Sequence, residues 1–419
     1  FWNVRKDVTR YSSLFTRSNV SLTVKLENVV NDVFTGIYHV NVTLYFYKDD
    51  AVGLYRKPAD LVIPVSSSNG SQEGYWFVIQ GTKDVRLKKF GIPQNTLRAV
   101  LEIYVSFHGD DEFWYSNPPD SYIRANNLTT GRGGGSYREV YVTIDGVIVG
   151  SEVPFPVIFT GGINPLFWQP VVAIGAFDLP SYDFDLTPFL GMGLLDGGDH
   201  VVGIGVNGSI PYWLVDANLH LWLDDSSTIL EGKTVISDNP RTVVKRRGEF
   251  RGLDGEFRVT AKRESRTVGW LNSPGRGNVT TSISHVLNIR SSVRFENNGT
   301  LKTVVQKART VTEVQASNDV GEVTSRVVIR RKYPLEVMTE TVSLGNVEAY
   351  VMRTKVSHAW EEKILLFSSG SRQGRVIRNR QESVGWMKVK DHDVLDGAAS
   401  TNQSLVVSDR EGFGCYIRA

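Results

Sequence analysis

The most concentrated group of reactive side chains lies in residues 106–120, which read SFHGDDEFWYSNPPD. The segment holds four acidic residues, His108 and a cluster of aromatic residues. Carboxylates can hold sugar hydroxyls or activate water, and sugar rings stack on aromatic faces. The segment is therefore a candidate carbohydrate-processing site. An acidic surface loop with anchoring aromatic residues would have the same composition, so both interpretations stay open at this stage.

Other motifs that carry chemistry are weak or missing in this sequence. Residues 131–135 (GRGGG) lack the Lys-Ser/Thr ending of a phosphate loop and precede a strand pattern, so we predict a flexible loop. The seven histidines show no paired ligand spacing, and we expect no metal site or cofactor. The single cysteine, Cys415, excludes an internal disulfide. No Gly-x-Ser-x-Gly motif supports a serine hydrolase of the α/β type.

The reactive segment follows a strong strand pattern. Alternating apolar residues between 97 and 105 predict one long strand. Helical spacing is hard to find, and the turns are rich in Gly, Pro, Asn and Asp. This pattern predicts an all-β fold of antiparallel jelly-roll or β-sandwich domains. Further strands are expected at 21–27, 38–47, 201–206 and 213–224, with a hairpin at 138–150 turned by Asp145 and Gly146.

Composition divides the chain into four parts. We predict the C-terminal part of a first, incomplete jelly roll at 1–48, a linker at 49–61, a second jelly roll at 62–225 and a C-terminal basic β-rich domain at 226–419. Residues 1–225 carry 16 Lys and Arg against 24 Asp and Glu, a net charge of −8, whereas residues 226–419 carry 31 against 21, a net charge of +10. Because these basic residues alternate with Val, Ile and Thr, they fit solvent-facing strand positions, and we do not expect nucleic-acid binding.

The number of Asn-x-Ser/Thr sequons indicates the secretory pathway. Chance would give about three at this content of Asn, Ser and Thr. We therefore predict a secreted or vacuolar glycoprotein. No run approaches 18 apolar residues, so no transmembrane helix or membrane partner is expected. The chain has eight sequons, at Asn19, Asn41, Asn69, Asn127, Asn207, Asn278, Asn298 and Asn402.

Several longer segments together carry a family signature. They are KDVTRYSS at 6–13, REVYVTIDG at 138–146, PFPVIFTGGINPLFW at 154–168, FDLTPFL at 184–190, HVVGIGV at 200–206 and WLVDANL at 213–219. With these segments the chain closely resembles the plant-type peptide N-glycanase A family of glycoamidases. It is similar, more distantly, to the bacterial N-glycanase built from two jelly rolls.

The resemblance implies which residues form the site. Glu27 and Glu112 match two functional glutamates of the bacterial enzyme, although by pattern alone Glu27 would be a solvated strand residue. The principal catalytic Asp of that enzyme has no counterpart here. We expect it on a small N-terminal chain from the same precursor, which would also complete the first jelly roll. The expected substrate contacts are His108, Asp111, Trp114 and Trp168.

The chain also departs from the bacterial pattern. The cysteines near the second glutamate are absent, Val29 replaces a tryptophan, and no matching arginine occurs between Trp168 and Pro180. The implied reaction is hydrolysis of the β-aspartylglucosaminyl amide of an N-glycopeptide, which releases the N-glycan as a glycosylamine and converts Asn to Asp. A glycoside hydrolase acting on N-glycans or a non-catalytic carbohydrate-binding protein are the alternatives.

Overall fold

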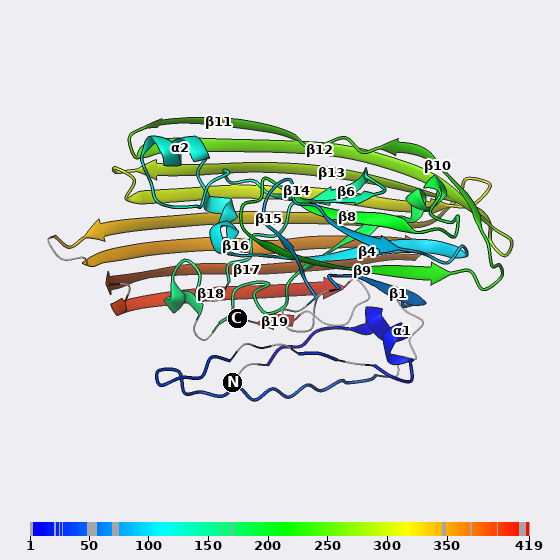
Figure 1. Ribbon diagram of the computed structural model, residues 1–419, viewed down its shortest axis with the longest axis horizontal. Helices are drawn as coiled ribbons and strands as arrows, with labels where there is room; N and C mark the ends of the chain where they lie inside the picture. The colour runs from blue at the N-terminus through cyan, green and yellow to red at the C-terminus, as the bar shows by residue number, and fades with distance from the viewer. Residues whose placement is uncertain are drawn as a thin grey trace.

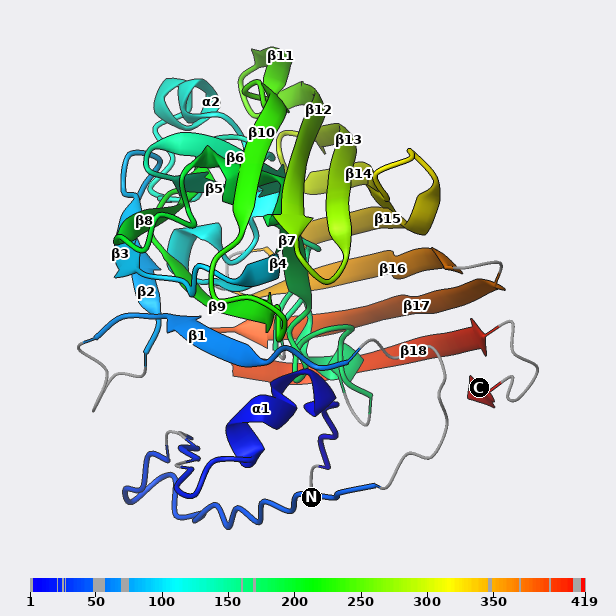
Figure 2. The same cartoon turned by 90° about the vertical axis from the view of Figure 1, so that its right-hand side faces the viewer.

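The computed structural model is an all-β protein of three antiparallel sheets (Figures 1 and 2), which confirms the predicted fold class. Cys415 and the sequon residue Asn69 fall outside the described part of the chain, as does Glu27. The structure describes residues 3–418 except 21, 25, 27, 48–56, 69–74, 160, 169–170, 346–348, 369–370, 392 and 410–415.

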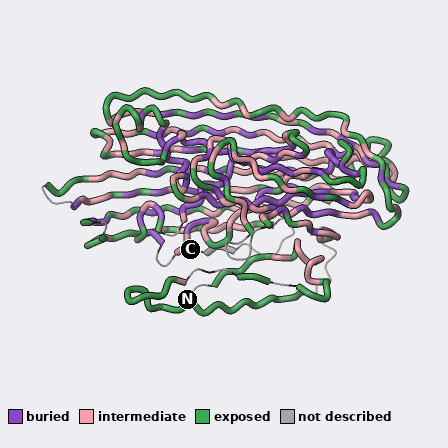
Figure 3. Tube along the Cα trace, in the orientation of Figure 1, coloured by how far each residue is buried: buried purple, intermediate pink, exposed green. Residues whose placement is uncertain are grey.

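The described residues between 3 and 47 contain only a short 3-10 turn, η1 (Thr9–Tyr11), and one helical turn, α1 (Ser12–Phe15). The strands predicted at 21–27 and 38–47 are wrong for the described residues of these stretches, which pair with no sheet. Their alternating apolar side chains are exposed (Figure 3); Leu22 is 64% and Val42 is 53% accessible. Alternation favours a strand only where a neighbouring backbone and an apolar surface are present.

A central sandwich is formed by the first two sheets. The predicted strands at 97–105, 201–206 and 213–224 are confirmed, and so is the hairpin, whose Asp145 and Gly146 both have positive φ. One sheet has the order β1-β9-β4-β7, with β2 also pairing with β9, and the other has the order β3-β8-β5-β6. Their strands are β1 (Leu61–Val65), β2 (Phe77–Ile79), β3 (Arg86–Phe90), β4 (Thr96–Phe107), β5 (Glu139–Ile144), β6 (Val147–Glu152), β7 (Ser181–Asp185), β8 (His200–Asn207) and β9 (Trp213–Leu223).

The third sheet is a ten-stranded meander in which most neighbours in space are also neighbours in sequence. Its longest strands have about twenty residues, much longer than strands in globular proteins usually are. These strands are β10 (Glu231–Asp238), β11 (Val243–Arg251), β12 (Asp254–Ser273), β13 (Gly277–Glu296), β14 (Leu301–Ser317), β15 (Val323–Ser343), β16 (Ala349–Ser368), β17 (Ser371–Lys390), β18 (Asp393–Asp409) and β19 (Tyr416–Arg418).

One face of the third sheet packs against the sandwich. Along β12, Val259 and Ala261 are buried, whereas Arg258, Thr260 and Lys262 between them point to solvent. Phe155, beyond β6, contacts the rings of Tyr333 and Trp360 on the third sheet, with ring centroids 5.3 and 5.2 Å away. Buried side chains of the sandwich and the third sheet belong to one hydrophobic cluster. The third sheet therefore shares its core with the sandwich.

The remaining regular elements are short. They are the helix α2 (Asp120–Ala125) and the 3-10 turns η2 (Gly109–Asp111), η3 (Trp114–Ser116), η4 (Pro165–Trp168) and η5 (Thr187–Met192). Within the described ranges, none of the helices has the length and apolar character needed to cross a membrane.

Candidate functional site

The reactive segment, residues 106–120, begins at the end of β4 and is hydrogen-bonded to the connection between β8 and β9. The backbone N–H groups of His108 and Asp110 donate to the carbonyls of Tyr212 and Pro211, both at 2.9 Å. Gly109 has a φ of +58°, a conformation that glycine adopts without strain, and this allows the sharp turn out of the strand. The segment therefore lies at the end of the sandwich where β4 ends.

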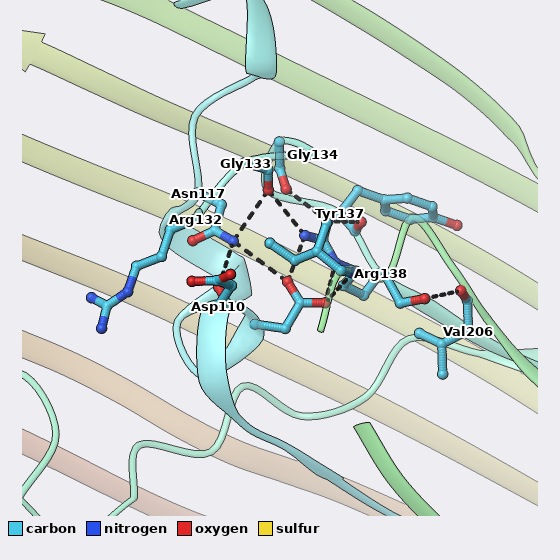
Figure 4. Close-up of polar contacts among 12 residues, drawn as sticks. Asp110, Asn117, Arg132, Gly133, Gly134, Tyr137, Arg138 and Val206 are labelled. Atoms are coloured by element: carbon cyan, nitrogen blue, oxygen red, sulfur yellow. Dashed lines mark hydrogen bonds and ion pairs between the residues drawn. The ribbon is translucent and has the colours of Figure 1, made fainter. Parts of the chain in front are cut away.

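A buried ion pair holds this segment in place (Figure 4). Arg138 at the start of β5 meets Asp111 with two hydrogen bonds, Nε to Oδ2 at 2.9 Å and Nη2 to Oδ1 at 2.7 Å. Both side chains are 0% exposed. The same Asp111 carboxylate accepts from the indole N–H of Trp213 at 2.6 Å and from the backbone N–H of Ile210 at 2.9 Å. A buried pair of this kind is stable only when such additional bonds satisfy its charges.

The glycine-rich loop at 131–135 completes this network. We predicted a flexible loop, but hydrogen bonds to its backbone carbonyls tie it to Arg138 and Asn117. Arg138 donates to the carbonyls of Gly133 and Gly135, at 3.2 and 2.8 Å. Asn117 donates to the carbonyls of Asp110 and Gly133, both at 3.2 Å. Three segments that are distant in sequence therefore converge on Asp111 and Arg138. Sequence reasoning missed Arg138 because nothing in its local pattern marks an arginine as buried.

His108 lies in an aromatic slot beside the network. Its ring stacks between Phe159 and Tyr212, with centroid distances of 5.8 and 5.2 Å and interplanar angles of 12° and 13°. Its Nε2 lies 2.8 Å from the Ser106 hydroxyl. Burial lowers the pKa of His108 from its ordinary value. Burial therefore favours the neutral imidazole, which both donates and accepts hydrogen bonds.

Glu112 directly follows the clamped Asp111 and is half-buried. Its carboxylate makes no hydrogen bond or ion pair with any other described residue, so its oxygens are available to a ligand. Burial raises the pKa of the neighbouring Tyr115, and the negative charge of Glu112 adds to this effect. Arg132 stacks over the ring of Phe113 at 4.8 Å. The arrangement places an unpaired carboxylate, a cation and aromatic faces in one region.

The third sheet supports the segment from its other side. Lys302 on β14 donates to the Ser116 hydroxyl at 3.2 Å. Burial, assisted by the positive charge of Arg132, lowers the pKa of Lys302 to about 8. Sequence reasoning also missed this lysine, because it lies 186 residues from Ser116.

Sequence similarity to known proteins identifies the family of this chain. The family model described as peptide N-acetyl-beta-D-glucosaminyl asparaginase amidase A matches residues 1–240. The chain belongs to this family. The peptide-N4-(N-acetyl-beta-glucosaminyl)asparagine amidase A of Prunus dulcis is 42% identical over 431 residues, which cover 100% of this chain and 73% of that protein. No solved structure matches the chain.

The remaining predicted substrate contacts lie inside the fold. Asp111 and Trp114 are 0% exposed and Trp168 is 5% exposed. The Trp168 indole N–H donates to the carbonyl of Gly162 at 3.0 Å. These buried side chains hold the surrounding loops in place and expose little or no surface to a sugar. Among the predicted site residues that the structure describes, the substrate contact His108 and the catalytic candidate Glu112 are the partly accessible ones; Glu27 lies outside the described residues.

The N-terminal signature segment docks on the outer face of the first sheet. Arg10 donates to Glu102 on β4 at 2.8 Å, and the Tyr11 hydroxyl donates to the same carboxylate. His220 on β9 lies 3.1 Å from it. Burial alone would raise the pKa of Glu102, but the hydrogen bonds of His220 and Tyr11 and the charge of Arg10 lower it to about 2. The ionised Glu102 therefore anchors the segment that leads to Glu27.

Six of the seven described sequon asparagines are exposed and accessible to a glycosylating enzyme. Asn207 differs, because it is half-buried and its side-chain amide donates to Glu139 at 3.2 Å. Its position favours a role in packing. Within the part of the chain that the structure describes, no group of three or more His, Cys, Asp or Glu side chains is arranged to hold a metal ion.

Proposed function

We propose that this chain acts as a glycoamidase that hydrolyses the β-aspartylglucosaminyl amide of N-glycopeptides. The N-glycan leaves as a glycosylamine, and the asparagine becomes aspartate. The observation that carries the proposal is the unpaired carboxylate of Glu112, which directly follows the ion-paired Asp111 in the segment that also carries His108, in a member of an amidase family.

The chemistry requires a water molecule to attack the side-chain carbonyl while a base accepts its proton. An acid must then protonate the leaving nitrogen. Two or three carboxylates can share these roles when their surroundings separate their pKa values. Glu112 orients the water and binds close to the scissile amide, with Glu27 as the second carboxylate. His108 contributes a neutral hydrogen-bonding ring to the sugar-binding side.

Product analysis tests this proposal against its alternatives. The protein is incubated with a defined N-glycopeptide, and the peptide and glycan products are separated by mass spectrometry. We expect a peptide with Asp in place of the glycosylated Asn and a glycan with both core GlcNAc residues. A peptide that retains one GlcNAc would identify a glycoside hydrolase, and binding without any product would identify a carbohydrate-binding protein.

We further propose that a companion polypeptide covers residues 22–47 and supplies the principal catalytic Asp. The support is the row of alternating apolar side chains in this stretch that are exposed, because a monomer seldom leaves such a row in contact with water. Pairing with this polypeptide would complete the predicted first jelly roll. Expression with and without the N-terminal part of the precursor tests this idea. We expect that part to copurify and to be required for activity, and full activity of the 419-residue chain alone would contradict the proposal.

We also propose that the protein is secreted or vacuolar and carries N-glycans. The support is the number of sequons and the exposure of six of the described asparagines. Glycans at these positions would extend from the surface without disturbing the cores of the sheets.

A further inference from the structure

The part of the outer face of the third sheet that is formed by β13–β16 carries three pairs of like charges on neighbouring strands. Arg290 on β13 is directly opposite Lys307 on β14, Arg309 on β14 is opposite Lys332 on β15, and Arg330 on β15 is opposite Lys363 on β16. We name these six residues the basic face. All six are exposed. None of them forms an ion pair with any residue that the structure describes.

Such pairs have a cost within the sheet. Directly opposite residues of an antiparallel pair have Cα atoms about 4.5–5.5 Å apart, so like charges there repel each other. A strand face that is only exposed to solvent does not require three adjacent pairs of like charges, because alternating positive and negative charges would give better solubility. A bound polyanion would be attracted to both cations of each pair and would offset the repulsion between them.

Some other cations on the third sheet are neutralised locally. Arg326 meets Glu313 at 2.8 Å, Arg353 meets Glu340 at 3.1 Å and Arg258 meets Glu256 at 2.8 Å. The carboxylates nearest to the basic face in the strand register are Glu361, opposite Lys332, and two diagonal neighbours, Glu336 beside Lys307 and Glu313, which pairs with Arg326. The basic face therefore keeps an excess of positive charge in the middle of the sheet.

The shape of the basic face favours an extended ligand. Strands lie about 4.8 Å apart and residues rise about 3.4 Å along a strand, so the six cations cover an area of about 14 Å by 14 Å. The residues between them in the register, including Asn288, Val311 and Pro334, offer no aromatic ring for stacking bases. The face also has no helix that could enter a nucleic-acid groove.

We propose that the basic face binds a linear acidic polysaccharide through its carboxylates. Lysine and arginine provide charge-assisted hydrogen bonds to successive carboxylates, and the exposed sheet surface accommodates a chain that lies across the strands. The site faces away from the sandwich that carries Glu112, so it would hold the protein on a polysaccharide without occupying the candidate active site. This binding is independent of the proposed amidase activity.

Binding of polygalacturonate to the full chain tests the proposal. A triple variant, Lys307→Thr, Arg309→Thr and Lys332→Thr, removes three charges of the basic face and keeps residues that suit strands. The matched control, Arg326→Thr, Arg353→Thr and Arg380→Thr, removes the same net charge from cations of the same sheet that each form an ion pair with a glutamate. We expect affinity for polygalacturonate to fall with rising salt concentration, and to fall at least about tenfold in the first variant and less than about twofold in the control.

Several results would overturn the proposal. Equal loss of affinity in the two variants would show that net charge alone determines binding. If the unmodified chain did not bind polygalacturonate, the proposed site would not exist. Tighter binding of single-stranded DNA or of vesicles with anionic lipids, lost in the first variant, would assign the face to a different partner. Thermal unfolding of both variants checks the fold, and we expect the first variant to be at least as stable as the unmodified protein because repulsion is relieved.

Discussion

Glu112→Gln is expected to lower the rate of glycan release from an N-glycopeptide by about 10²–10⁴-fold, the range typical for loss of a group that transfers a proton or orders the reacting water. Glutamine keeps the shape of the side chain but has neither the negative charge nor the basic oxygen. Because the Glu112 carboxylate has no hydrogen bond or ion pair within the described residues, its loss leaves the packing of the segment intact. The measurement is kcat on a defined glycopeptide, with thermal unfolding of the same preparation.

A charge-matched control separates catalysis from a general effect of charge. Glu336→Gln removes one exposed carboxylate on β15, far from the reactive segment in sequence and on the outer face of the third sheet. We expect this variant to keep nearly full activity. A Glu112→Gln enzyme that releases glycan at close to the unmodified rate would remove Glu112 from the proposed mechanism.

Arg138→Met is expected to destabilise the protein by about 3–5 kcal/mol, because it leaves the buried Asp111 charge without its partner. It also removes the donor to the carbonyls of Gly133, Gly135 and Tyr137. The loop that carries Glu112 then loses its clamp, so activity should fall together with stability. Chemical and thermal unfolding measure the first effect, and kcat at a temperature well below unfolding measures the second.

Two further variants make this prediction specific. The double variant Asp111→Leu/Arg138→Met removes both charges and should recover part of the lost stability, since no unpaired charge stays buried. Arg326→Met breaks an exposed pair with Glu313 and should cost far less stability than Arg138→Met, because solvent screens the exposed pair. If Arg138→Met unfolded like the unmodified chain, the ion pair would not be what holds the segment.

The predictions of single strands succeeded where the sequence pattern and the tertiary structure agree. Apolar alternation through β4 and β9 reflects one face in the sandwich core, and the Asp145-Gly146 turn needs two residues that accept positive φ. The same alternation failed for residues 22–47. A strand is stabilised by a partner, and the described part of the chain gives this stretch none.

Sequence pattern alone could not give the arrangement of the third sheet. It indicated strands after residue 226, but not their length or that one face of the meander shares a core with the sandwich. Alternation is a local property with a period of two residues, and it says nothing about which distant surface covers the apolar face.

The sequence by itself determined the all-β class, the family signature and the position of Glu112 just beyond the end of a long strand. The tertiary structure decided which of the neighbouring reactive residues are available. It buried Asp111 against Arg138, which lies 27 residues away, and enclosed Trp114, while Glu112 between them kept an unpaired carboxylate. Burial depends on segments brought together from distant parts of the chain, so residue type and spacing cannot specify it.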